Sequence, residues 1–86
     1  MVHIRAQQWT TRKYYTTVED MPEDIDLKKV ANHLKKVLKT SSSIKENKKQ
    51  GGKKVILLAG DFREEIKSFL IDQGIVKEDE INVHGF

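Results

Sequence analysis

The sequence predicts an α/β plait, an α+β fold in which two helices pack on one face of a mixed four- to five-stranded sheet. Two observations indicate this fold. Short runs of apolar or alternating residues flank two longer segments with helical periodicity, in the order two strands, helix, one or two strands, helix, strand. At 86 residues, the chain can bury one sheet under one layer of helices but not a second core. We therefore expect residues 1–86 to form a single domain.

The first two strands are expected to form a hairpin with an exposed tip. Residues 2–8 alternate between apolar and polar side chains, which is typical of a half-buried strand. Its partner is the β-branched and aromatic run 14–19, and the pattern leaves open whether Tyr14 or Tyr15 points inward. The tip at residues 9–13 lacks the Asn-Gly or Asp-Gly of a tight two-residue turn, so we expect a longer, more mobile connection.

The first helix is predicted to run from Leu27 to about Lys39. Asp26 precedes it and is a good N-cap, because its carboxylate can accept hydrogen bonds from the first free amides. The residues that form one apolar face at helical spacing are Leu27, Val30, Ala31, Leu34, Val37 and Leu38. The lysines that occupy the remaining surface, with no acid among them, are Lys28, Lys29, Lys35, Lys36 and Lys39. Helices selected for solubility alone usually mix signs, so this surface favours a phosphate-rich partner.

The stretch from Lys53 to Leu70 is expected to be the centre of the fold. Its continuous apolar run, Val55–Ala59, predicts a strand that is buried on both faces in the middle of the sheet. After Gly60 breaks this strand, Asp61 is expected to cap a second helix, with Glu64 reaching back to complete a capping box. The apolar stripe of this helix is expected to consist of Phe62, Ile66, Phe69 and Leu70.

The remaining segments are predicted to be two short strands and a basic loop. Gly74 is expected to end the second helix, and a last strand begins near Ile81. Residues 44–46 are expected to start another short strand, followed by a loop at 47–54 that contains two glycines and four lysines. Across residues 28–54 there are ten lysines and one acid. The loop does not match a phosphate-binding loop, so a solvated hairpin connection is its simplest interpretation.

The net charge of +3 conceals an asymmetry along the chain. Residues 1–58 contain 13 Lys or Arg against 6 Asp or Glu, a balance of +7. Residues 59–86 contain 3 against 7, a balance of −4. Although most charged runs are simply solvated surfaces, the unmixed lysines of the first helix indicate that an anionic partner binds the basic part of the chain.

The composition argues against several classes of function. There is no cysteine, and His3, His33 and His84 lack metal-binding spacing, so neither a metal nor another cofactor is expected. No nucleophile motif is present and the acids lie in expected caps and turns, so nothing predicts an enzyme. No apolar run approaches the ~20 residues of a membrane span, and the opening segment does not resemble a cleavable signal, so we expect a cytoplasmic protein without membrane contact.

Several short segments match a known family in their order and spacing. In the first half these are HIR and QQ within residues 3–8, RK at 12–13, TTV at 16–18 and DLKK at 26–29. In the second half they are GD at 60–61, Arg63, FL at 69–70 and VHGF at 83–86. No single segment is decisive, but together they are specific. Over almost its whole length, the chain resembles the SUI1 family of translation initiation factors.

This resemblance implies a function in the selection of the start codon. A factor of this kind binds the small (40S) ribosomal subunit near the P site, promotes scanning and opposes premature accommodation of the initiator tRNA. It leaves when the start codon is recognised. The implied partners are the subunit and its rRNA, mRNA, initiator tRNA and initiation factors 1A, 2, 3 and 5, and the free protein is expected to be a monomer.

The resemblance also implies where RNA is bound. The hairpin tip approaches mRNA and initiator tRNA, which carries over to Gln7, Gln8, Arg12 and Lys13. The basic face of the first helix lies against rRNA, which carries over to Lys28, Lys29, Lys35 and Lys36. The residues expected to make up the family signature are Gly60, Asp61, Arg63, His84, Gly85 and Phe86. The expected contacts are to RNA shape and phosphates rather than to base edges.

The chain departs from the family pattern in four places. The tip usually reads Arg-Asn-Gly-Arg-Lys, whereas Trp9, whose ring could stack on a base, begins the tip here. The family's second loop is shorter and acidic, whereas this one contains Lys48 and Lys49 near initiator tRNA, so steric obstruction rather than charge repulsion would carry over. The usual acidic tail before the first strand is not part of this sequence, and Phe62 replaces the usual Gln.

Two other functions remain as alternatives to this interpretation. One is a SUI1-domain factor that acts in ribosome recycling or reinitiation, which is normally a longer chain without the terminal His-Gly-Phe. The other is an acylphosphatase-like α/β-plait enzyme, which has a similar size and architecture. Such an enzyme would need an arginine over a glycine-rich phosphate loop, and Arg5 and Arg12 do not lie in such a loop.

Overall fold

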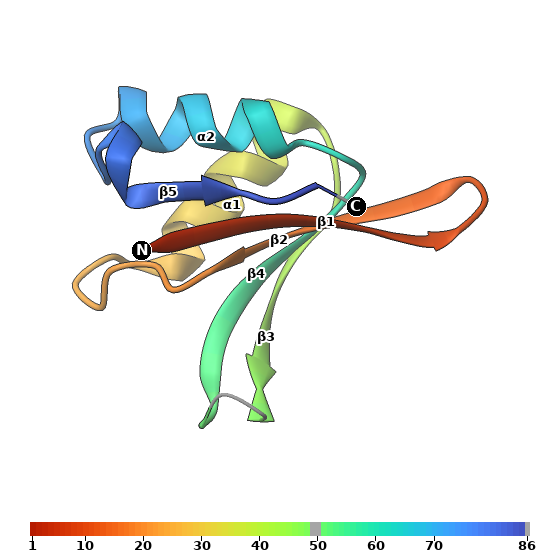
Figure 1. Ribbon diagram of the computed structural model, residues 1–86, viewed down its shortest axis with the longest axis horizontal. Helices are drawn as coiled ribbons and strands as arrows, with labels where there is room; N and C mark the ends of the chain where they lie inside the picture. The colour runs from red at the N-terminus through yellow and green to blue at the C-terminus, as the bar shows by residue number, and fades with distance from the viewer. Residues whose placement is uncertain (49–50, 86) are drawn as a thin grey trace.

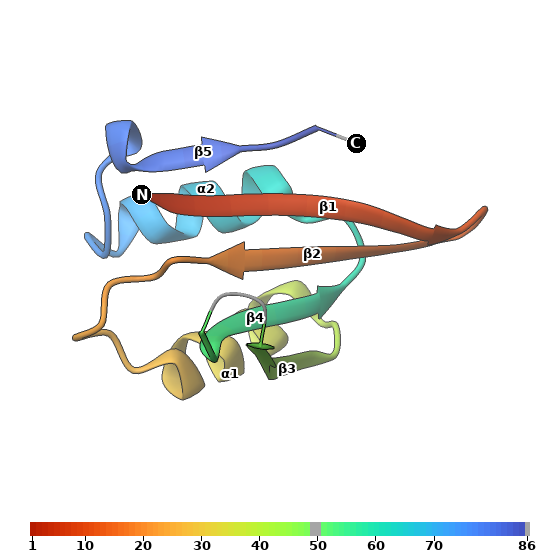
Figure 2. The same ribbon diagram turned by 60° about the horizontal axis from the view of Figure 1, so that its bottom comes forward.

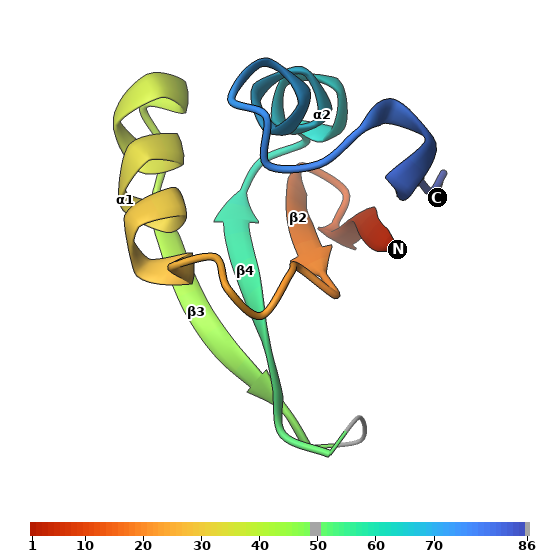
Figure 3. The same cartoon turned by 90° about the vertical axis from the view of Figure 1, so that its left-hand side faces the viewer.

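The computed structural model describes residues 1–48 and 51–85 (Figure 1). In chain order, the elements are β1 (Val2–Thr10), β2 (Lys13–Glu19), α1 (Leu27–Leu38), β3 (Ser42–Asn47), β4 (Lys53–Ala59), α2 (Arg63–Asp72), the 3-10 helix η2 (Glu78–Glu80) and β5 (Ile81–Val83). The strands form one sheet in the order β3-β4-β2-β1-β5, in which β1 and β5 are parallel and the other three pairs are antiparallel (Figure 2). Both helices lie on one face of this mixed sheet (Figure 3), which confirms the predicted fold class.

The apolar strand β4 occupies a different place in the sheet from the one predicted. It is second in the order, and β2 is the central strand. Its side chains alternate, because Ile56 and Leu58 are fully buried whereas Val55 and Leu57 on the opposite face are only half-buried. The prediction of two buried faces was wrong because both helices cover the same face, so the other face of β4 has no layer over it.

The hydrophobic core lies between the two helices and the covered face of the sheet. Helix α1 packs over β3 and β4, and α2 packs over β1 and β5. The buried residues of the core are Val2, Ile4, Val18, Val30, Ala31, Leu34, Ile56, Leu58, Ile66, Leu70 and Val76. Burial of each large aliphatic side chain contributes about 1.5–3 kcal/mol relative to exposure. The alternation of residues 2–8 therefore has the predicted physical cause, since Val2, Ile4 and Ala6 face the helices.

Helix α1 begins as predicted and ends at Leu38, one residue before the predicted end. The Oδ1 atom of Asp26 accepts hydrogen bonds from the backbone N–H groups of Lys28 and Lys29, at 3.1 and 3.3 Å. The helix stops because Lys39 adopts a left-handed conformation with a φ of 53°. Val37, which was expected on the apolar face, is 57% exposed because it lies at the edge of that stripe.

The start of α2 differs from the prediction. The helix begins at Arg63, the preceding N-cap position is Phe62, and no side chain caps the helix. Asp61 instead binds Arg63 through both carboxylate oxygens, at 2.9 Å to Nε and 2.9 Å to Nη2. A guanidinium group presents two parallel donors that match a carboxylate, so this pair replaces the expected cap. Glu64 and Glu65 in the first turn still complement the helix dipole.

Three other features of the second half bear on the prediction. Gly74 has a φ of +68° directly after the C-cap Gln73, which confirms the expected glycine stop. Strand β3 starts two residues earlier and ends one residue later than expected. The segment predicted as a polar connection contains the 3-10 helix η2. Among the described residues, no helix combines the length and apolar character needed to span a membrane.

Candidate nucleic-acid interface

The hairpin of β1 and β2 projects well beyond the helices, and its tip is at the right of Figure 1. The turn consists of Thr11 and Arg12 alone, since Thr10 pairs with Lys13, so the prediction of a longer tip was wrong. Neither turn residue takes a positive φ, so no glycine is required. A register shift between Gln8 and Thr10 adjusts the strands to this turn, and bulges of this kind increase strand twist.

The side chains at this tip are exposed to solvent. Gln7, Gln8, Arg12 and Lys13 are all exposed, as the sequence predicted for an RNA-facing segment. The amide of Gln8 donates a hydrogen bond to the carbonyl of Thr11, at 3.4 Å. The side chain of Trp9 lies outside the described part of the structure. The tip therefore presents two cations and two amides without covering any of the core.

The four lysines that the resemblance assigned to rRNA are all exposed on α1. At 100° per residue, Lys28, Lys29, Lys35 and Lys36 fall within about 120° of the helix circumference, on the side opposite the core. Lys35 and Lys36 lie in the last turn, where the helix dipole favours cations. Lys28 and Lys29 lie in the first turn, which contains no acid and where the dipole disfavours them. Helix stability does not explain this second pair.

The second hairpin, formed by β3 and β4, projects away from the helices at the bottom of Figures 1 and 3. Gly51 and Gly52 form its turn with φ values of 72° and 81°, a conformation that favours glycine. Lys48 is exposed near this end. Lys49 lies outside the described residues. At the base of the hairpin, Lys53 donates to Asp20 at 3.2 Å, so this lysine is already part of an ion pair.

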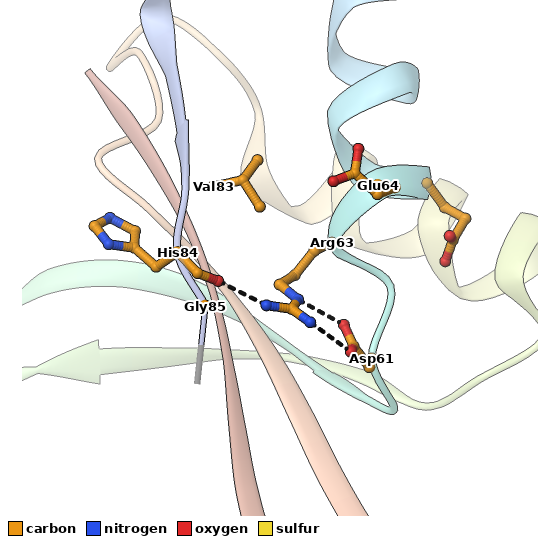
Figure 4. Close-up of a pocket in the computed structure, with 7 residues that line it drawn as sticks. Asp61, Arg63, Glu64, Val83, His84 and Gly85 are labelled. Atoms are coloured by element: carbon orange, nitrogen blue, oxygen red, sulfur yellow. Dashed lines mark hydrogen bonds and ion pairs between the residues drawn. The ribbon is translucent and has the colours of Figure 1, made fainter.

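The residues of the predicted family signature gather where the end of β5 meets the start of α2 (Figure 4). Arg63, held by Asp61, donates through Nη1 to the backbone carbonyl of His84 at 2.9 Å. The backbone N–H of His84 in turn donates to Ile4 at 2.8 Å. These contacts attach the chain after β5 to both α2 and β1. Phe86 lies outside the described residues, and Gly85 is exposed beside this junction.

The electrostatics of this junction are those of a structural contact. Its hydrogen bonds with Arg63 lower the pKa of the Asp61 carboxyl, against a smaller opposite effect of burial. The ring of His84 is hydrogen-bonded to His3, with 2.9 Å between Nε2 and Nδ1, and burial together with the charge of Arg5 lowers the pKa of His84. Within residues 1–48 and 51–85, no three side chains of His, Cys, Asp or Glu gather in a way that could hold a metal ion.

The structure does not bring the predicted RNA-binding residues into one patch. They lie on three separate features, namely the tip of the first hairpin, the outer surface of α1 and the end of the second hairpin (Figure 1). Sequence reasoning missed the contribution of Tyr15 to the uncovered face, although the strand register resolves the question. Tyr14 falls in the same alternating row as the buried Thr16, so Tyr15 faces the uncovered side.

These features define a small α/β plait with cationic projections, and the comparisons identify its family. The model of the family "Translation initiation factor SUI1" matches residues 1–76. The chain belongs to this SUI1 family of translation initiation factors, as its sequence resemblance indicated.

Relatives of known name support this assignment along nearly the whole chain. The "Protein translation factor SUI1 homolog" of Acanthamoeba polyphaga mimivirus is 44% identical over 85 residues, which cover 99% of this chain and 79% of that relative. "Eukaryotic translation initiation factor 1" of Mus musculus is 41% identical over 85 residues, covering 99% of this chain and 74% of that protein. The human counterpart is 40% identical with the same coverage.

A solved structure supports the fold independently. The crystal structure of the C-terminal domain of human eIF2D superposes with a TM-score of 0.85 at 16% sequence identity. The match covers 94% of this chain and 41% of that chain. At this level of identity the likeness concerns the fold alone.

Proposed function

We propose that this chain binds the small ribosomal subunit near the P site, promotes scanning and opposes premature accommodation of the initiator tRNA. Membership of a family of translation initiation factors supports this function. Its partners would be the 40S subunit with its rRNA, mRNA, initiator tRNA and initiation factors 1A, 2, 3 and 5. It would act as a cytoplasmic monomer before it joins the subunit, without enzymatic activity or a cofactor.

The observation that carries this proposal is the lysine surface of α1. Two of its lysines stand in the first turn, at a cost of a few tenths to about 1 kcal/mol each from the helix dipole. Asp26 offsets part of this cost as the N-cap, but its carboxylate is committed to two backbone amides. A surface that retains like charges against these costs is expected to bind phosphates, and rRNA supplies them.

The first prediction concerns Lys28 and Lys29. Changing both to Glu should weaken binding to isolated small subunits by on the order of tenfold, because two phosphate contacts are lost and two repulsions added. The log-log slope of affinity against salt should flatten by roughly 0.7–0.9 per lost contact. Because Glu is favoured in a first turn, the variant should remain folded, which circular dichroism can verify. Fluorescence anisotropy over a salt series measures the binding.

A variant with Lys67→Glu and Lys77→Glu is the matched control, since it has the same change in net charge. Both of these lysines belong to the acidic half of the chain. If the control loses as much affinity as the α1 variant, the effect is one of total charge and α1 is not the rRNA-binding surface. Changing Lys35 and Lys36 to Glu should weaken binding in the same way as the first-turn pair.

A further inference from the structure

Two hollows on the surface meet at Tyr15. The first has a volume of about 400 Å³ and is lined by Gln7, Gln8, Tyr15 and Leu57. The second has a volume of about 380 Å³ and is lined by Arg12, Lys13, Tyr14, Tyr15, Ala59 and Gly60. Tyr15 lines both, so an apolar hollow edged by amides lies beside a hollow edged by cations.

The strand register explains why Tyr15 lies on this surface. On the uncovered face of the sheet, Tyr15 stands in one row between Gln7 of β1 and Ala59 of β4. Leu57 is in the next row, two residues along β4. Gln7 and Ala59 are both small or flexible enough to leave the ring accessible, and Tyr15 is half-buried rather than covered. The result is a flat apolar area about the width of one aromatic ring.

The first hollow has the chemistry that a nucleobase requires. A base has two apolar π-faces and a polar edge, and stacking on an aromatic side chain tolerates any base. The ring of Tyr15 and the side chain of Leu57 provide the apolar surface. The exposed amide of Gln7 makes no hydrogen bond within the described part of the chain, so it can donate to or accept from a base edge.

The second hollow has the chemistry that a phosphate requires. Arg12 and Lys13 are exposed, and neither forms an ion pair with another described residue. Residues 1–18 contain no acid at all. The acid next to Gly60 is Asp61, whose carboxylate is bound to Arg63 at 2.9 Å and so does not compete for these cations. The local charge around the turn is therefore positive without compensation.

We propose that this surface binds one unpaired nucleotide of a single-stranded RNA, with its base stacked on Tyr15 and its phosphate held by Arg12 and Lys13. The inference rests on the proposed function, in which this hairpin faces RNA, and it names the form of RNA that is bound. A duplex cannot occupy the site, because its bases are already stacked and paired. Two cations beside an aromatic ring also match a nucleotide better than they match an apolar peptide.

The test uses the intact chain and three labelled RNA probes of equal phosphate number: a uridine hexamer, an abasic hexamer and a duplex. Stacking of one base is worth about 1–3 kcal/mol, so the uridine hexamer should bind about 5- to 150-fold more tightly than the abasic one. Tyr15→Leu should reduce this ratio toward one while leaving the affinity for the abasic hexamer unchanged. Tyr15→Phe should restore the ratio, since it keeps the ring.

Two further variants keep the test decisive. Phe69→Leu removes a half-buried aromatic ring from α2, remote from the hairpin, and should leave the ratio unchanged. If Tyr15→Leu does not fold, Leu57→Thr removes the apolar surface on the other side of the same hollow and should lower the ratio. Changing Arg12 and Lys13 to Ala should weaken both hexamers equally, because both have the same phosphates.

A ratio near one for the native chain, or a ratio that survives Tyr15→Leu in a folded protein, overturns the nucleotide site. Measurement of small-subunit binding with the same protein separates the two proposals. Subunit binding together with a ratio of one contradicts the nucleotide site alone. Loss of subunit binding contradicts the proposed function, whatever the hexamers show.

Discussion

At the scale of single residues, Gly60 and Thr16 together hold the junction between β4 and α2. The hydroxyl of Thr16, which is fully buried, donates to the carbonyl of Gly60 at 2.6 Å and accepts from the N–H of Phe62 at 3.0 Å. The N–H of Gly60 donates to Tyr14 at 2.7 Å. One buried hydroxyl thus satisfies two backbone groups at the strand end, which fixes where the helix can start.

We expect Gly60→Ala to destabilise the protein by about 1–3 kcal/mol. Gly60 has a φ of +114°, and a Cβ atom there would lie 2.5 Å from the ring of Phe62, so both the backbone and the packing oppose the change. Denaturant unfolding measures the loss. Gly74→Ala is the control, because its φ is also positive at +68° but nothing lies within 4 Å of the added atom. Equal losses at the two positions would show that the contact with Phe62 contributes nothing.

At the scale of elements, strand β5 is only three residues long and depends on side-chain contacts at its end. Its ladder with β1 joins Val2 to Ile81 and Ile4 to Val83. Beyond the ladder, the chain is held through His84 by Arg63 and by the ring of His3. A strand this short has few backbone hydrogen bonds, so these side chains contribute much of its attachment.

The pH dependence of stability should report this attachment. Burial first, and then the charges of Arg5 and His3, lower the pKa of His84, while Glu19 acts in the opposite direction. A histidine with a lowered pKa in the folded state binds protons more readily when unfolded. Its stabilising effect is therefore complete above the unfolded pKa of about 6.5 and is lost as the pH falls toward the folded value.

The native chain should thus lose stability between about pH 7 and pH 5, and His84→Gln should flatten this slope in denaturant unfolding. His33→Gln is the control, since that ring stacks on Phe69 at 4.9 Å, away from β5. Parallel pH profiles for the native chain and His84→Gln would show that this histidine is not coupled to folding.

The first hairpin behaves as an element with two functions, since its base belongs to the sheet and its tip projects from it. Arg12→Ala and Trp9→Ala should each leave the fold intact but alter the stringency of start-codon selection. For Arg12 the reason is the loss of an exposed cation near RNA. A reconstituted scanning assay with cognate and near-cognate codons measures the effect, with Gln73→Ala as a control at a remote turn. Unchanged use of near-cognate codons would exclude the tip from the mechanism.

At the scale of the whole molecule, local patterns predicted the elements better than their neighbours. The periodicity of residues 27–38 and the cap at Asp26 follow from contacts within a few residues, so the sequence contained them. The position of β4 depends on which face the helices cover, which an apolar run does not encode. The contact between His3 and His84 joins residues 81 apart, and the pair of Asp61 with Arg63 replaced a locally plausible cap.

The charge asymmetry of the sequence also gains a spatial meaning. The basic residues that we propose for RNA binding occupy three projections, whereas the exposed acids of η2 lie beside β5. An RNA partner would be attracted to the hairpins and α1 and repelled by the region around η2. The orientation on a phosphate-rich surface is therefore restricted before any specific contact forms.

The pairing of β1 with β5 brings residues from the two ends of this sequence into one ladder. During synthesis, β1 leaves the ribosome first and β5 last, so this ladder cannot close until residue 83 has emerged. Until then β1 presents an unpaired edge next to β2, and such edges are prone to pair with other chains. The last step of folding is thus a contact of nearly maximal sequence separation, which slows it relative to the local hairpins. A nascent copy of this protein would complete its sheet only after its own translation was almost finished.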